Sequence, residues 1–140
     1  MLKIAQILSG LLALALFAFA ALYIFNPTAA ASARGFEPVG DYGMTNIRLL
    51  AATFVTLGSM SAIGAVKKNF LFLAPAAIYF LVSIVIRIIG ITVDGADPTT
   101  LRVMIPAVIL FIVAEFALQV FKRAEKDEGN AQLAGMPIPR

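Results

Sequence analysis

The sequence contains no cysteine, no histidine and no tryptophan. Without thiols and imidazoles it lacks disulfides, thiol nucleophiles, imidazole general bases and the usual ligands of zinc, haem and iron–sulfur clusters. We therefore expect no metal site and no cofactor, and we expect that the protein is not an enzyme.

Charge is also scarce, since 14% of the 140 residues are charged and 61% are apolar. An ordinary soluble domain is about 45 to 50% apolar, and here the mean hydropathy is +0.93. The charges form short clusters between long apolar runs, which is typical of loops between membrane spans. The net charge of +3 comes from basic residues at the ends of these runs, so we expect no nucleic-acid partner.

Four apolar runs are long enough for a membrane-spanning helix of about 20 residues: 4–25, 44–66, 70–93 and 101–121. The third run is rich in Ile and Val but far too long for a strand. The first run has a rival interpretation as a secretory signal peptide, because Ala31-Ser32-Ala33 resembles a cleavage site. At about 22 residues it exceeds the roughly 7 to 15 of a signal-peptide core, so we expect a retained span.

The connections carry turn signals. Residues 26–43 hold two prolines and three glycines, which favours turns and an interfacial stretch with room for a short helix over 28–33. Residues 67–69 allow only a tight connection, and 94–98 (DGADP) predict a compact turn, after which Thr99 or Thr100 is suited to capping the next helix. The polar tail, 122–140, is expected to add one helical turn and then fray.

Basic residues set the orientation, because Lys and Arg are retained on the cytoplasmic side. One side of the predicted bundle holds Lys3, Lys67, Lys68, Lys122, Arg123 and Lys126. The other side holds Glu37, Asp41, Asp94 and Asp97, balanced by Arg34, Arg48 and Arg102. The sequence therefore predicts an all-α, four-helix membrane bundle with both ends in the cytoplasm.

Charged residues within the spans are the best clues to function, because hydrocarbon makes them costly. Arg48 and Arg87 fall at the same predicted outer depth. Their candidate partners are Asp94, Asp41, Asp97 and the Tyr23 hydroxyl. One interpretation is structural: both arginines extend to the outer interface or hold loops through ion pairs. The other is an outward-facing pocket for an anionic headgroup or another anion, which Arg recognises through paired hydrogen bonds.

A second polar layer is predicted near the cytoplasmic face, centred on Glu115 and followed by Gln119 on the same helix side. Candidate hydroxyl donors at that depth are Tyr79, Ser59 and Ser61. Helix–helix hydrogen bonding, a proton or cation relay and contact with a partner subunit all remain open.

Three short motifs carry a family resemblance: Asn46-Ile47-Arg48, then Arg87 with Asp94-Gly95 and Pro98, and Glu115. Together they resemble a family of small bacterial four-span membrane proteins known only as a domain of unknown function, over residues 11–121. The resemblance implies a multi-pass protein of the bacterial inner membrane with Arg48, Arg87, Asp94 and Glu115 as family positions. A looser likeness to DoxX-type four-helix proteins rests on layout alone.

Two functions follow from these observations. The first is an accessory or structural subunit that packs against other membrane subunits, favoured by small loops and by the lack of catalytic residues. The alternative is a binding or transport module for a lipid, a quinone or a small anion, possibly formed by self-association. The expected partners are therefore membrane lipid and either other membrane subunits or further copies of the chain. A membrane enzyme is disfavoured, because Glu115 has no evident nucleophile or metal beside it.

Overall fold

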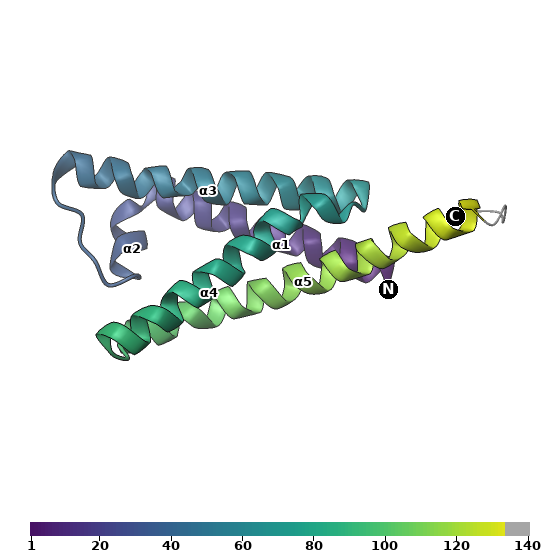
Figure 1. Cartoon of the computed structure of the whole chain (residues 1–140). Coiled ribbons are helices and arrows are strands. Elements are labelled where there is room, and N and C mark those ends of the chain that lie inside the picture. Colours follow the sequence, from purple (N-terminus) through teal and green to yellow (C-terminus); the bar gives the residue numbers. More distant parts are fainter. Residues whose placement is uncertain (134–140) are drawn as a thin grey trace.

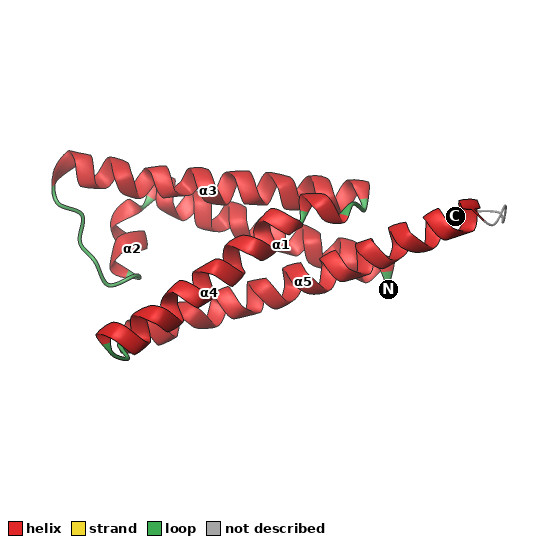
Figure 2. Ribbon diagram, in the orientation of Figure 1, coloured by secondary structure: helices red, strands yellow, loops and turns green. Residues whose placement is uncertain are grey.

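The computed structural model describes residues 1–133, and the side chains of residues 1–132. Every element in this part of the chain is helical (Figure 2): α1 (Leu2–Phe25), α2 (Pro27–Ser32), α3 (Gly40–Lys67), a 3-10 turn η1 (Phe70–Phe72), α4 (Ala74–Asp94) and α5 (Pro98–Leu133). Within these described residues, four helices are long and apolar enough to cross a membrane. The predicted all-α, four-helix membrane bundle is confirmed.

Helix ends differ from the predicted spans at three places. The third predicted span, 70–93, is divided into η1 and α4, which begins at Ala74. α3 begins at Gly40, one turn before the predicted start, and α5 continues to Leu133, well past the single turn expected after residue 121. Lys, Arg, Glu and Ala dominate this extension, and all of them are good helix formers. The last part of the predicted tail, 134–140, lies outside the described residues.

The residue that caps the start of α5 lies two to three positions earlier than expected. Asp97, rather than Thr99 or Thr100, caps the helix: its carboxylate accepts the backbone N–H groups of Thr99 at 2.7 Å and Thr100 at 3.2 Å. Gly95 provides the positive φ, 97°, that lets the chain reverse.

The four long helices form two antiparallel hairpins, α1 with α3 and α4 with α5, which are joined mainly where α1 packs on α5 (Figure 1). The buried residues of α1 recur every three to four positions, and those of α3 do the same, so each helix presents one continuous stripe to its neighbours. Small residues bring α1 and α3 close together. A Cβ added at Gly58 would lie 3.2 Å from the Phe17 ring of α1. Gly64 instead faces the connection that follows α3, where an added Cβ would clash with the Leu73 side chain.

The two hairpins lie close together near the chain termini and separate toward the opposite end, where α1 and α4 end and α3 and α5 begin (Figure 1). We call this space the fork and that end its open end. α2 lies within the fork (Figure 1), with Ala30 and Ala31 buried, and its first turn is capped by the Asn26 side chain.

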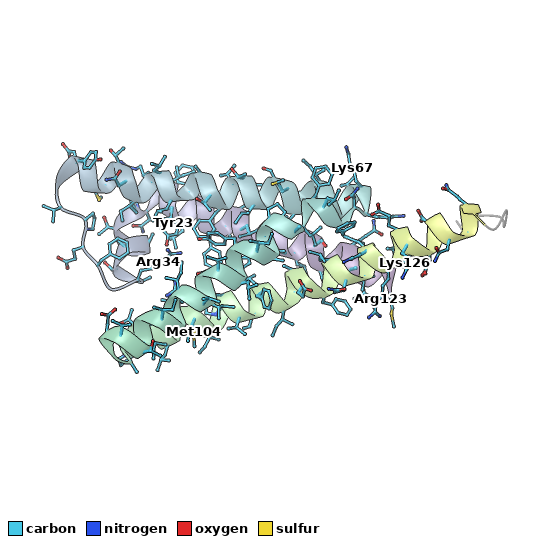
Figure 3. The ribbon with its side chains drawn as sticks, in the orientation of Figure 1. Tyr23, Arg34, Lys67, Met104, Arg123 and Lys126 are labelled. Carbon is cyan, nitrogen blue, oxygen red and sulfur yellow. The ribbon has the colours of Figure 1, made fainter. Side chains whose placement is uncertain are left out.

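Both described chain ends lie at the closed end of the bundle, near the basic residues Lys67, Arg123 and Lys126 (Figure 3). The assignment of this end to the cytoplasm stays a prediction that rests on the distribution of Lys and Arg. The outward faces of α4 and α5 are apolar and exposed, with side chains such as Ile78, Ile105 and Ile109 more than half accessible. Such faces suit contact with acyl chains.

Candidate functional site

A cavity of about 270 Å³ lies in the fork and is lined by residues of α1, α2, α3, α4 and α5 and by the segment after α2. Its apolar wall is aromatic and centred on Phe54. The Phe54 ring centroid lies 5.4 Å from that of Tyr23, 5.8 Å from that of Phe19 and 6.3 Å from that of Tyr79. These distances are typical of packed aromatic pairs, so the wall is preformed.

Arg34 enters the cavity from the segment that follows α2. Its backbone N–H donates a hydrogen bond to the Ala31 carbonyl at 2.9 Å, and this bond holds the backbone from which the side chain projects. The guanidinium carbon lies 5.0 Å from the Tyr23 ring centroid and 5.8 Å from that of Phe54. Figure 3 shows Arg34 directed at Tyr23 across the fork. Cation–π attraction to the two rings holds the charge in place.

Arg87 enters the same cavity from α4. Its Nε is buried and has no hydrogen-bond partner among the described residues. The direction follows from helix geometry, since Cα–Cβ bonds tilt toward the N-terminus of a helix. Because α4 ends at the open end of the fork, the Arg87 side chain starts back toward Ser83 and Tyr79, which also line the cavity.

Arg102 completes the set from the first turns of α5, with its side chain exposed at the rim. Three arginines therefore line the cavity, and none of the described residues that line it is Asp or Glu. An arginine in a membrane protein is usually paired with a carboxylate or with backbone carbonyls. Here the neighbouring polar groups are the hydroxyls of Tyr23, Tyr79 and Ser83.

A second, more polar space of about 400 Å³ adjoins the cavity and shares Arg34, Arg87 and Val103 with it. We call it the polar mouth; its other lining residues are Gly35, Phe36, Asp97, Thr99 and Thr100. Hydrogen bonds from Thr99, and from the backbone of Thr100, lower the pKa of Asp97. This carboxylate is therefore ionised at neutral pH, and it is engaged in capping α5.

The structure places only two residues of the predicted outer layer in the cavity. Tyr23 and Arg87 line the cavity, whereas Arg48 and Asp94 are exposed and do not. Arg48 Nε donates to the Ile24 carbonyl at 3.4 Å, at the end of α1. α3 begins at the open end of the fork, so the same Cβ tilt that turns Arg87 inward turns Arg48 outward. Equal depth along two antiparallel helices therefore does not bring the two side chains together.

The predicted inner layer is not assembled. Glu115 is half-buried and accepts a 2.7 Å hydrogen bond from Gln119 on its own helix. Ser61 is fully buried, but its hydroxyl has no partner among the described residues, and Ser59 is half-buried nearby on α3. Tyr79 lies in the cavity beside the arginines instead.

Two of the three arginines, Arg34 and Arg102, are not predicted as site residues from the sequence, because both fall in or beside loops, where a charged side chain is ordinary. The sequence does carry one further signal for the cavity itself. Tyr79, Ser83 and Arg87 fall at i, i+4 and i+8 and so share one face of α4. No sequence pattern places Arg34 beside that face of α4, because the position of Arg34 depends on how α2 folds back into the fork.

Comparisons with known proteins identify no relative: no family model, no curated protein and no solved structure matches the chain. The resemblance to a four-span bacterial family therefore stays a prediction. Within residues 1–133 there is also no group of three or more Asp and Glu residues placed to hold a metal ion.

Proposed function

We propose that this multi-pass membrane protein binds an anionic amphiphile without chemically altering it. The phosphate or carboxylate of the ligand sits between Arg34 and Arg87, and its adjoining apolar part rests on the aromatic wall. The observation that carries the proposal is the described lining of the cavity: it has three arginines, no Asp or Glu, and a buried Arg87 Nε without a partner among the described residues. Asp97, in the adjoining polar mouth, is engaged in capping α5.

Electrostatics favours a bound anion over an empty cavity. A buried donor without a partner costs about 1–3 kcal/mol, and the charges of Arg34 and Arg87 repel each other in the cavity. Cation–π contacts with Tyr23 and Phe54 offset only part of this cost, about 0.5–2 kcal/mol at such sites. An oxyanion would supply paired acceptors for both guanidinium groups.

The size of the cavity limits what it holds. At about 270 Å³ it is close to the lower end of the roughly 300–1,000 Å³ of small-molecule pockets. It therefore suits a charged headgroup and the first part of an apolar chain rather than a whole lipid. A quinone fits the aromatic wall but offers no negative charge for the arginines.

The other predicted roles have less support. Each of the four long helices is continuous, so residues 1–133 show none of the broken helices that form substrate sites in many transporters. The exposed apolar faces of α4 and α5 would suit a partner subunit, but acyl chains cover such faces equally well. Accessory packing, a place in the bacterial inner membrane and the orientation of the ends remain predictions from the sequence.

The binding experiment uses delipidated protein in a neutral detergent. Dioleoylphosphatidylglycerol, oleate and dioleoylphosphatidylcholine are titrated separately, and bound molecules are counted by native mass spectrometry. We expect the two anions to bind and the zwitterionic lipid to bind far more weakly. Arg87→Gln and Arg34→Gln should each weaken binding about 10- to 100-fold, as expected for the loss of a charged hydrogen bond worth roughly 1.5–3 kcal/mol.

Arg48→Gln is the matched control, because Arg48 lies at the same predicted depth but outside the cavity. It should bind like the unmodified chain. Equal affinity for anionic and zwitterionic lipids, or equal losses in all three variants, would contradict the proposal. Binding of oleate but not of the phospholipid would restrict the ligand to carboxylates.

A further inference from the structure

The flank of α4 carries a groove that continues from the cavity. It is lined by Tyr79, Val82, Ser83, Ile86 and Arg87, which fall at i, i+3, i+4, i+7 and i+8 and so form one stripe along the helix. Tyr79, Ser83 and Arg87 also line the cavity. The groove and the cavity therefore adjoin each other along a shared polar edge.

No other helix of the described chain lines this groove. α4 packs mainly on α5 and only slightly on α3, although α3 precedes it in the chain (Figure 1). Two apolar side chains form the outer part of the groove, Val82 at 48% and Ile86 at 62% exposed. Ile86 lies eight residues before the end of α4, about 12 Å along the helix axis. At that depth the groove faces acyl chains rather than water.

Polarity changes in order across these adjoining spaces. The α4 groove is apolar at Val82 and Ile86, and the cavity holds Arg34 and Arg87. The polar mouth ends at Thr99, Thr100 and the Asp97 carboxylate that caps α5. A membrane lipid has the same order of acyl chain, charged group and polar headgroup. A soluble anion would use the polar mouth alone and leave the groove without a role.

We propose that the occupant is an anionic membrane lipid that enters sideways from the bilayer and leaves an acyl chain in the α4 groove. This inference rests on the proposed function, since the charged group of the lipid is held by Arg34 and Arg87. It adds the source of the ligand, its route and the position of its chain. The hydroxyls of the polar mouth face the remainder of the headgroup.

The absence of tryptophan makes the groove directly testable, because a single introduced Trp is the only indole in the molecule. Ile86→Trp and Val82→Trp each place the reporter in the groove. Ile88→Trp is the matched control: Ile88 is 50% exposed and lines none of the three spaces described above. It lies about 200° around α4 from Ile86. Circular dichroism checks that all variants keep the same helicity.

Each variant is reconstituted in phosphatidylcholine vesicles that contain a small fraction of phosphatidylglycerol. Bromine atoms, which quench indole fluorescence on contact, are carried on the acyl chains of either the anionic or the zwitterionic lipid. At residues 82 and 86 we expect the brominated anionic lipid to quench more per molecule, by no less than the factor of about five that a single basic residue gives an anionic lipid near a membrane surface. At residue 88 the two lipids should quench equally.

Arg87→Gln in the same Trp variants should remove the preference at both groove positions. Equal quenching by the two lipids at residues 82 and 86 would overturn the inference. If anionic lipid still binds in an Arg87-dependent way by mass spectrometry, the proposed function stands and only the lateral position of the chain is wrong. If that binding is also absent, both proposals fail.

Discussion

Arg87→Met is expected to make the ligand-free protein more stable while abolishing ligand binding. The Arg87 Nε is buried without a hydrogen-bond partner in the described part of the chain, and its charge shares a cavity with that of Arg34. Methionine keeps an unbranched apolar stem against Tyr79 and Ser83 but removes both the orphan donor and the charge. Opposed effects of this kind are common where a site is strained for function.

The magnitude follows from the unpaired donor. Burying a polar group without a partner costs about 1–3 kcal/mol, so the free energy of unfolding should rise by about that amount in Arg87→Met. Arg48→Met is the control, because Arg48 donates to the Ile24 carbonyl. Its loss should lower the free energy of unfolding by about 0.5–1.5 kcal/mol.

The assay is reversible unfolding of delipidated protein by sodium dodecyl sulfate in a neutral detergent, followed by far-ultraviolet circular dichroism. Addition of phosphatidylglycerol should then stabilise the unmodified chain and leave Arg87→Met unchanged, since only a protein that binds the lipid gains from it. An Arg87→Met protein that is less stable without lipid, or that still gains stability from the anionic lipid, would refute the reasoning.

Three further predictions concern the fold. Gly64→Ala should lower the free energy of unfolding by about 1–3 kcal/mol, because the new Cβ would clash with the Leu73 side chain. Gly10→Ala, where nothing lies within 4 Å of the new Cβ, should raise the free energy of unfolding by about 0.5–1 kcal/mol. Unfolding in detergent measures both variants, and equal effects would argue against the close contact between Gly64 and Leu73. Asp97 has a lowered pKa, so its contribution to stability is present above its unfolded pKa of about 3.9 and is lost as the pH falls through the lower folded value. Asp97→Asn, which keeps a good capping side chain, should remove that acid-dependent loss, whereas Asp97→Ala should also be less stable at neutral pH; thermal unfolding across this range measures both, and an Asp97→Asn protein with an unchanged acid profile would contradict the capping role. A fluorescent reporter fused to the C-terminus should fold and emit in the cytoplasm, because the basic flanks gather at that end of the bundle; activity of an exported-only reporter at that end would reverse the topology.

The lengths of the apolar runs were enough to predict the bundle. A helix that crosses hydrocarbon must satisfy its backbone internally and reach about 30 Å, so four such runs allow few other folds. The compact turn at Gly95 was equally readable, because a positive φ favours glycine.

The cavity was only partly predictable. Depth along the chain placed Arg87 and Tyr23 correctly in one layer, but it also placed Arg48 there and Tyr79 elsewhere. Depth counts Cα positions, whereas a long side chain reaches about a turn or more in the direction set by its helix. That direction is inward for Arg87 on α4 and outward for Arg48 on α3, so the antiparallel arrangement separates them.

Arg34 shows a second limit of sequence reasoning. Its place over the rings of Tyr23 and Phe54 depends on α2 folding back into the fork, with Ala30 and Ala31 buried. Small alanines allow this return but do not specify it, since the same composition suits an interfacial segment. Arg34, which packs on the aromatic wall, therefore lies in the part of the chain whose sequence pattern says least about its structure.

Crystallisation from a lipidic mesophase doped with phosphatidylglycerol would show what fills the cavity. We expect density for a phosphate within hydrogen-bond distance of both the Arg34 guanidinium and the Arg87 Nε, with an acyl chain running along Val82 and Ile86. A cavity without an anion, in which Arg87 Nε donates to a carboxylate or carbonyl of the protein itself, would contradict the assignment of this protein as a binder of anionic lipid.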